Sequence, residues 1–224
     1  MKQIVPAILT NDEQDFAHKL RVLEQISVPE VQIDVIDGKF VDNTTIGLDV
    51  IKKYPTSMRR EVHLMVVNPV AVAKEYLAAG IDSVIVHYEY LSSLFDLDQF
   101  ARRPVGLAID PETPVSSIAG IAGGVSLILI MGVKAGFAGQ PFLPETLNRV
   151  RQLRQAVPTG KIEVDGGVSD ELIAKVFAAG ADKVVFNCQR IVDSSDPAAY
   201  WAQIIKKYDA FPATNRVLKT RRRR

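Results

Sequence analysis

The chain of 224 residues has a single cysteine, Cys188, and no apolar run long enough to cross a membrane. One cysteine excludes an intrachain disulfide, which fits a reducing compartment. The first residues, MKQIVPAILTNDE, contain one basic residue and a short apolar stretch followed by acids, which is not the pattern of a signal peptide. We therefore expect a cytoplasmic protein that has no membrane partner.

Outside the C-terminal end the chain has no net positive charge. Residues 210–224 hold six basic residues and no acid, namely Arg216, Lys219 and the final RRRR. When this basic tail is set aside, the net charge falls from +1 for the whole chain to −5 for residues 1–209. A mildly acidic body argues against a nucleic-acid partner. We expect residues 1–209 to form one catalytic domain and residues 210–224 to be a disordered basic tail.

Apolar, β-branched segments alternate with segments of helical period along the whole chain. Strands are predicted at 3–9, 31–37, 60–66, 83–89, 104–110, 126–132, 161–166 and 183–188, and helices near 12–26, 46–53, 69–79, 91–101, 114–121, 144–156, 169–179 and 196–208. Eight such repeats without a Gly-, Ser- or Pro-rich linker favour an α/β fold, a single (β/α)8 TIM barrel with a parallel eight-stranded sheet. A doubly wound open sheet is the alternative. No dinucleotide glycine fingerprint follows the first strand, so we expect no nucleotide cofactor.

Polar side chains gather where the predicted strands end. In the segment VQIDVID at 31–37, Gln32 and Asp34 share one face and the apolar residues share the other. Buried polar groups need partners, and the active site of such a barrel lies at the C-terminal ends of its strands. The other predicted strands supply further groups near that end: His63, Met65, His87, Glu89, Asp110, Met131, Asp165, Asn187 and Cys188. We expect titratable groups from at least five strands to meet at one mouth.

Each candidate also has an ordinary structural interpretation. A lone histidine near a strand end is more often a satisfied structural residue than a ligand, and for His87 both interpretations remain open. For His63 the functional interpretation is favoured, since Asp34 and Asp165 are expected opposite it. Other candidates also have structural interpretations: Asp37-Gly38 and Asp110-Pro111 as turns, and Met65 and Met131 as core.

Glycines follow the sixth and seventh predicted strands. The loop at 132–140 reads GVKAGFAGQ, and Gly166-Gly167 follows Asp165. Glycines let backbone N–H groups approach an anion, and barrels often bind phosphate on this side. Together these loops predict a small phosphorylated substrate.

Seven segments resemble the ribulose-phosphate 3-epimerase family. They are VPAIL at 5–9, DVIDGKFVDNTTIG at 34–47, EVHLMV at 61–66, VHYE at 86–89, GLAIDPETP at 106–114, GFAGQPF at 136–142 and EVDGGV at 163–168. They fall in order across nearly the whole expected domain, and as a set they are specific. The basic tail lies outside the resemblance.

The resemblance implies the epimerisation of D-ribulose 5-phosphate to D-xylulose 5-phosphate at C3, within the pentose phosphate pathway. It implies that Asp34 and Asp165 transfer protons on opposite faces of an enediolate, and that His63 joins both in binding a divalent metal, which could be Zn, Fe, Mn or Mg. It places Met65 and Met131 beside the site as an apolar floor and suggests a homo-oligomer. The positions it implies for phosphate or substrate binding are Gly136, Ala138, Gly139, Gln140, Gly166, Gly167, Asn187 and Cys188.

Several pocket positions depart from the family pattern. Gln32 stands where the family has its first metal-binding histidine, and Ala7 replaces a serine. The Gly-Ser after the last strand is Asn187-Cys188, with Arg190 close by. In the loop after the sixth strand, the departures are Gly132, Ala135 and Ala138.

Three functions therefore remain open from the sequence. The first is a working epimerase with a weakened or altered metal site, which would suit the oxygen-preferring ions Mn²⁺ or Mg²⁺. The second is an isomerase for another phosphosugar, and the third is a non-catalytic relative that binds a sugar phosphate or a protein. The retained residues Asp34, His63 and Asp165 favour an enzyme.

Overall fold

Eight parallel strands close into a barrel in the computed structural model, which describes residues 2–93, 96, 99–100 and 103–209. Each strand pairs with the next, and the last pairs with the first, which confirms the predicted (β/α)8 barrel. The strands are β1 (Gln3–Ile8), β2 (Glu30–Ile36), β3 (Arg59–Met65), β4 (Ser83–His87), β5 (Val105–Ile109), β6 (Ile128–Met131), β7 (Ile162–Asp165) and β8 (Lys183–Asn187).

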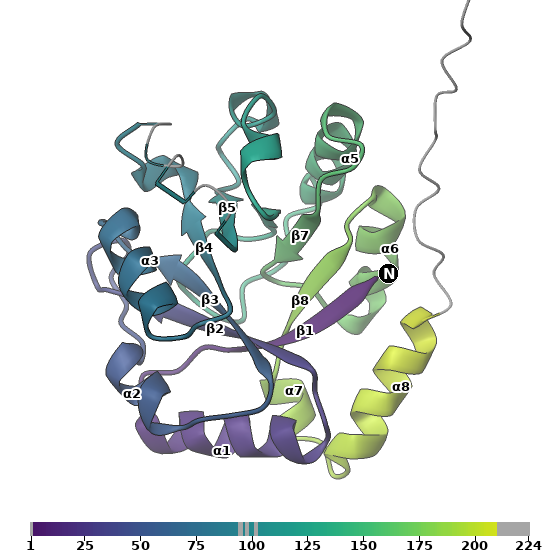
Figure 1. Ribbon diagram of the computed structural model, residues 1–224. Helices are drawn as coiled ribbons and strands as arrows, with labels where there is room; N and C mark the ends of the chain where they lie inside the picture. Colours follow the sequence, from purple (N-terminus) through teal and green to yellow (C-terminus); the bar gives the residue numbers. More distant parts are fainter. Residues whose placement is uncertain (1, 94–95, 97–98, 101–102, 210–224) are drawn as a thin grey trace, which may run out of the picture.

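Helices surround the barrel, as the view in Figure 1 shows. They are α1 (Glu13–Gln25), α2 (Leu48–Lys53), α3 (Pro69–Ala78), α5 (Thr146–Ala156), α6 (Asp170–Ala179), α7 (Gln189–Val192) and α8 (Pro197–Asp209). Short 3-10 segments are η1 (Tyr88–Tyr90), η2 (Val115–Ser117) and η3 (Ala122–Gly124).

One helix prediction is wrong. The segment 114–121 forms η2 and a turn in place of an α-helix. Gly120 and three β-branched residues within the segment lower its helix propensity, and Gly123 and Gly124 follow directly, which explains the short 3-10 turns. The helix expected near 91–101 lies partly outside the described residues, and the basic tail at 210–224 lies wholly outside them.

The core forms two layers separated by the barrel wall. Val31, Ile33 and Val35 of β2 belong to the large cluster that also includes buried residues of the surrounding helices. Met65 and Met131 belong to a second, smaller cluster with Ile36, Phe40, Ile85, Ala108, Leu127, Leu129, Val133 and Ala135. Because side chains alternate along a strand, Gln32 and Asp34 point to the opposite side of the wall from Val31, Ile33 and Val35.

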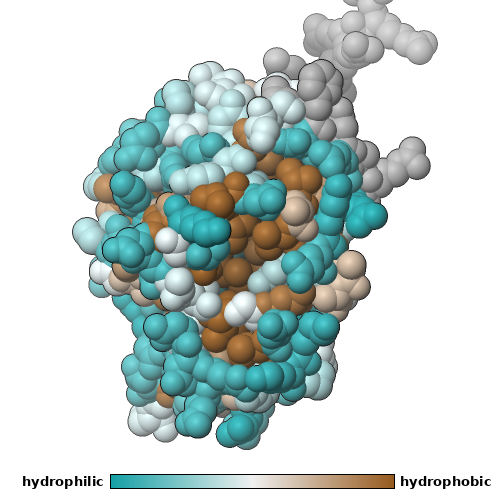
Figure 2. Space-filling model, turned by 90° about the vertical axis from the view of Figure 1, so that its left-hand side faces the viewer, coloured by the Kyte–Doolittle hydropathy of each residue, from teal (hydrophilic) through white to brown (hydrophobic). Residues whose placement is uncertain are grey.

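The outer surface is uneven in polarity. Figure 2 shows the face toward which β2 and β3 point in Figure 1, and hydrophobic residues gather at its centre, bordered by hydrophilic ones. Within the residues that the structure describes, no helix is both long and apolar enough to span a bilayer.

Candidate active site

Two aspartates from well-separated strands meet inside the barrel. The register pairs Asp34 on β2 with His63 on β3, and Asp165 ends β7. The side-chain amide of Gln32 connects the two carboxylates, because its Nε2 donates to Oδ1 of Asp34 at 2.9 Å and to Oδ2 of Asp165 at 2.8 Å. The expected convergence of these four side chains is therefore present.

His63 faces the same two carboxylates. Its Nδ1 lies 3.6 Å from Oδ1 of Asp34 and 3.5 Å from Oδ2 of Asp165, distances that exceed a good hydrogen bond. Burial would lower the pKa of His63, but the carboxylates of Asp165 and Asp34 outweigh burial and raise that pKa to about 10. Burial also raises the pKa of Asp34, so this carboxyl holds a proton more readily than an exposed aspartate does.

Asp34, His63 and Asp165 form a set that fits a divalent cation. Each offers one ligand atom, and all three atoms lie within 4.8 Å of one another. Neighbouring ligands of an ion bound at about 2.0–2.2 Å are separated by roughly the 3.5–3.6 Å seen here. In the described part of the chain, neither Nδ1 of His63 nor Oε1 of Gln32 has a hydrogen-bond partner. Oε1 of Gln32 is thus free to act as a ligand, and Nδ1 of His63 can act as one once a bound cation displaces its proton.

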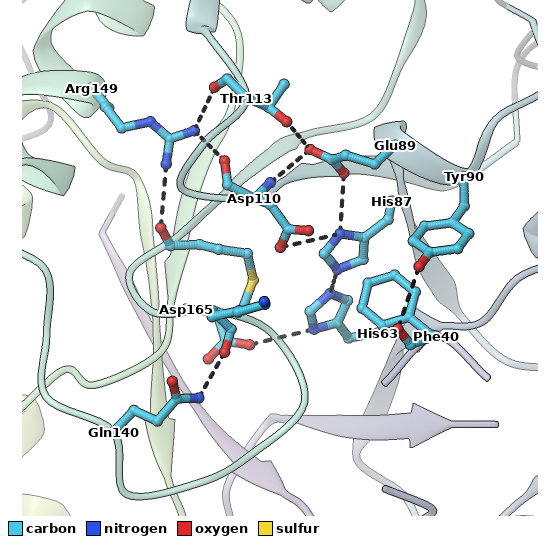
Figure 3. Close-up of polar contacts among 12 residues, drawn as sticks. Phe40, His63, His87, Glu89, Tyr90, Asp110, Thr113, Gln140, Arg149 and Asp165 are labelled. Carbon is cyan, nitrogen blue, oxygen red and sulfur yellow. Dashed lines mark hydrogen bonds and ion pairs between the residues drawn. The ribbon is translucent and has the colours of Figure 1, made fainter. Parts of the chain in front are cut away.

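A second polar cluster adjoins the first through the two histidines. Nε2 of His63 lies 2.9 Å from Nε2 of His87, and Nδ1 of His87 lies 3.3 Å from Oε2 of Glu89 and 3.8 Å from Oδ1 of Asp110 (Figure 3). Burial lowers the pKa of His87 to about 4. Burial and the charge of Glu89 raise the pKa of Asp110 to about 6. His87 is therefore a neutral imidazole at pH 7, placed between a carboxylate and His63.

A cavity of about 250 Å³ opens beside the two aspartates. Its lining contains most of the residues predicted to bind substrate: Ala7, Met65, Met131, Gly136, Ala138, Gly139, Gln140, Gly166, Gly167 and Asn187, together with Asp34, His63 and Asp165. Arg190 is the one lysine or arginine among the described lining residues. Gln32, His87 and Cys188 do not line this cavity.

The glycines beside the cavity are required by close backbone packing. Gly166 and Gly167 have φ of +100° and +67°. A Cβ on Gly167 would lie 2.7 Å from the backbone nitrogen of Phe142, and one on Gly132 would lie 2.4 Å from the carbonyl oxygen of Gly166. Gly132, one of the departures from the family pattern, therefore permits a close approach between the two loops that a larger residue would prevent.

The segment after β8 offers fewer anion-binding groups than the resemblance implied. Cys188 is buried, burial raises its thiol pKa to about 12, and its backbone N–H donates to the carbonyl oxygen of Ala7. Oδ1 of Asn187 accepts the backbone N–H of Gln189 at 2.9 Å. We therefore leave Cys188 out of the binding residues proposed below.

Arg149 was not among the residues expected from the sequence. This buried side chain on α5 donates through Nη2 to the backbone oxygens of Asp110 at 2.7 Å and of Thr113 at 2.9 Å. It thereby holds the turn after β5, the turn that also contacts Glu89 (Figure 3). An arginine on an amphipathic helix carries no sequence signal for this role, because such residues are usually solvated.

A (β/α)8 barrel with two facing carboxylates at one cavity suits acid–base isomerisation, and comparisons with known proteins agree. The chain belongs to the ribulose-phosphate 3-epimerase family, because the sequence model of that family matches residues 3–190. This membership identifies the protein as an epimerase, which is a kind of isomerase, and so favours an enzyme over a non-catalytic binding protein. A phosphosugar substrate is consistent with the family.

Curated relatives cover most of the chain. The "Ribulose-phosphate 3-epimerase" of Chlamydia muridarum is 35% identical over 193 residues, which are 81% of this chain and 85% of that protein. The protein of the same name from Mycobacterium tuberculosis is 32% identical and covers 92% of this chain and 93% of its own length. Among solved structures, a 3-hexulose-6-phosphate synthase is similar in fold, with a TM-score of 0.63 at 18% identity, over 91% of this chain and 98% of that one.

Proposed function

We propose that this chain interconverts D-ribulose 5-phosphate and D-xylulose 5-phosphate, with Asp34 and Asp165 as the two acid–base groups. The observation that carries the proposal is the meeting of two carboxylates from β2 and β7 at one cavity. Inversion of a carbon needs one group to remove a proton from one face and another to return a proton to the opposite face. Two separate strands can supply groups on both sides of the substrate.

The surrounding residues support this proton transfer. Burial raises the pKa of Asp34, which brings it closer to the range of an effective general acid or base near neutral pH. Met65 and Met131, which are both buried, give the cavity an apolar floor that excludes water from the enediolate. A divalent ion held by Asp34, His63 and Asp165 would supply Lewis-acid stabilisation of the charge that develops on the ketone oxygen.

The phosphate would bind at the glycine side of the cavity. Gly139, Gly166 and Gly167 line this side and have positive φ, a conformation that lets the backbone approach a ligand closely. Arg190 adds the positive charge, and its Nη1 is held 3.0 Å from Oδ1 of Asp170. Since Asn187 already accepts the N–H of Gln189, we assign the guanidinium a larger share of phosphate recognition than the backbone of α7.

Isotope exchange tests the proposed reaction. Purified protein given ribulose 5-phosphate in deuterium oxide, with Mn²⁺, Mg²⁺, Zn²⁺ or Fe²⁺ in separate reactions, is expected to form xylulose 5-phosphate that carries deuterium at C3. Mass spectrometry and ¹H NMR of the product would locate the label. Substrate recovered without label from every reaction would refute the proposal.

We further propose that the ion is Mn²⁺ or Mg²⁺, since Gln32 offers an amide oxygen where an imidazole would favour Zn²⁺ or Fe²⁺. The change Gln32→His is then expected to tighten Zn²⁺ binding by about tenfold or more, because imidazole is the better ligand for zinc. Equilibrium dialysis with metal analysis measures the affinity. Gln32→Met, which keeps the length of the side chain and removes its oxygen, is the matched control. Equal zinc affinity in the wild type and both variants would show that position 32 does not contact the ion.

We also propose that the protein acts in the cytoplasm as a homo-oligomer. The homo-oligomer is proposed from the resemblance to the family alone. The single cysteine supports a reducing compartment.

A further inference from the structure

The two buried histidines share one proton between their Nε2 atoms. These atoms are 2.9 Å apart, and the two rings are nearly parallel, with an interplanar angle of 14°. An N···N contact of this length needs a proton on one nitrogen and a lone pair on the other. The direction of this hydrogen bond decides which nitrogen of His63 keeps its proton when a cation displaces the other proton of the ring.

The partner of Nδ1 of His87 gives that direction. Oε2 of Glu89 lies 3.3 Å from this nitrogen, and an ionised carboxylate only accepts hydrogen bonds. Various contacts hold the Glu89 pKa below its ordinary value despite burial, first among them the hydrogen bond with His87, so the group is ionised at pH 7. Nδ1 of His87 therefore carries the proton, and Nε2 of this neutral ring accepts.

The other end of Glu89 is fixed independently. Its Oε1 accepts the backbone N–H of Asp110 at 2.9 Å and the hydroxyl of Thr113. Arg149 holds the same turn through the backbone oxygens of Asp110 and Thr113. Two donors on Oε1 leave Oε2 as the oxygen that faces His87 (Figure 3).

We propose that Glu89 and His87 are positioning residues that keep Nε2 of His63 protonated, so that Nδ1 of His63 is the nitrogen presented to the two aspartates. The proposal rests on the proposed function only in the use it assigns to that nitrogen, as a metal ligand in the active site. A metal-binding histidine usually donates the N–H of its other ring nitrogen to a fixed acceptor. Here that acceptor is Nε2 of His87, and His87 is itself oriented by the carboxylate of Glu89.

The change Glu89→Gln should reverse the chain of hydrogen bonds. The two donors at Oε1 retain the amide oxygen, so the amide NH₂ turns to Nδ1 of His87 and makes that nitrogen an acceptor. His87 then carries its proton on Nε2 and donates to Nε2 of His63. The one proton that a neutral His63 keeps is then on Nδ1, which leaves no lone pair there for a metal.

Asp110→Asn provides a matched control. Asp110, like Glu89, places a carboxylate near the ring of His87. Its Oδ1, however, lies 3.8 Å from Nδ1 of His87 and makes no hydrogen bond to it. Both variants remove one negative charge beside His87. Only Glu89→Gln removes the acceptor.

The tautomer of His87 is measured by ¹⁵N NMR on the full chain labelled at histidine. The chain has three histidines, and His18 is exposed. The signal that disappears in His18→Gln is therefore assigned to His18, and the two that remain belong to His63 and His87. We expect Nδ1–H for His87 in the wild type and in Asp110→Asn, and Nε2–H in Glu89→Gln. We also expect Mn²⁺ affinity, measured by equilibrium dialysis, to fall about 10–100-fold in Glu89→Gln and to change less than threefold in Asp110→Asn.

Several outcomes would overturn the proposal. Nε2–H on His87 in the wild type would favour a cation site on His87, Glu89 and Asp110, whose ligand atoms also lie within 4.8 Å of one another. An unchanged tautomer in Glu89→Gln, or the same change in Asp110→Asn, would reduce Glu89 to a structural residue. The NMR result does not depend on turnover, so a protein that fails to epimerise ribulose 5-phosphate would still test the tautomer.

Discussion

Replacing Asp34 or Asp165 with asparagine is expected to lower kcat for epimerisation by about 10²–10⁴-fold. Asparagine keeps the shape of the side chain but cannot take up or release the proton. The KM for the phosphosugar should change little, because phosphate binding is assigned to Gly139, Gly166, Gly167 and Arg190 and not to either carboxylate. Steady-state kinetics with ribulose 5-phosphate and with xylulose 5-phosphate measures both constants.

The two variants should differ in which epimer still exchanges its C3 proton with solvent. If one aspartate serves each face, each variant keeps the base for one epimer and can remove and return a proton on that face alone. One variant is then expected to put deuterium from solvent into C3 of ribulose 5-phosphate, and the other into C3 of xylulose 5-phosphate, both without inversion. This division would not arise if a single group served both faces.

Asp193→Asn is the control for a change of net charge. Asp193 is an exposed residue that follows α7 on the same side of the barrel, and it is not part of the cavity. It should keep the kcat of the wild type. A kcat near that of the wild type in either Asp34→Asn or Asp165→Asn would remove that residue from the proposed chemistry.

The fold and the position of the site follow from local patterns in the sequence. In β2, period-two alternation sends Val31, Ile33 and Val35 to one side of the wall and Gln32 and Asp34 to the other, and this pattern is visible without a structure. Eight repeats of strand and helix then allow few other closed arrangements. The mouth of the barrel could be predicted because the C-terminal ends of parallel strands meet there.

Contacts between distant side chains could not be predicted in this way. The sequence marks Gln32 as a poor metal ligand, but its bridge to both Asp34 and Asp165 depends on the distance across the barrel. The sequence also does not show that Cys188 turns into the core, because that depends on how α7 leaves β8. These details are set by packing among elements, which a one-dimensional pattern does not encode.

The opposite end of the barrel holds a network that sequence analysis overlooked. Nζ of Lys183 lies 2.7 Å from Glu30, 2.5 Å from Glu61 and 3.1 Å from Glu163, measured to their carboxylate oxygens. Glu61 lies two residues before His63, and Glu163 two residues before Asp165, so the same alternation places both inside the barrel. Alternation alone could have found them, since they fall on the inward face of strands already predicted.

Lys183→Met is expected to lower the free energy of unfolding by about 3–5 kcal/mol. Glu61 and Glu163 are 2% and 0% exposed, so loss of the ammonium group would leave buried carboxylates without a cation. Burial and repulsion from Glu61 already raise the pKa of Glu163, in opposition to Lys183. Urea unfolding followed by circular dichroism measures the loss of stability.

The loss should depend on pH. Without Lys183 the pKa of the buried Glu163 carboxyl is raised further above that of the unfolded chain, so the folded state binds more protons than the unfolded state. The protonated form of Glu163 is favourable at low pH, and that contribution is lost as pH rises through its folded-state pKa. The deficit of Lys183→Met is therefore expected to be larger at about pH 8 than at about pH 5.

Lys161→Met tests whether the buried contacts, and not the lost charge alone, cause this effect. Lys161 is exposed and lines the same end of the barrel, so its replacement should change the free energy of unfolding by less than about 0.5 kcal/mol. Adding Glu163→Gln to Lys183→Met should recover part of the lost stability at about pH 8, because it removes one of the uncompensated buried charges. If Lys183→Met were as stable as Lys161→Met at both pH values, the three glutamates would not depend on Lys183 for their burial.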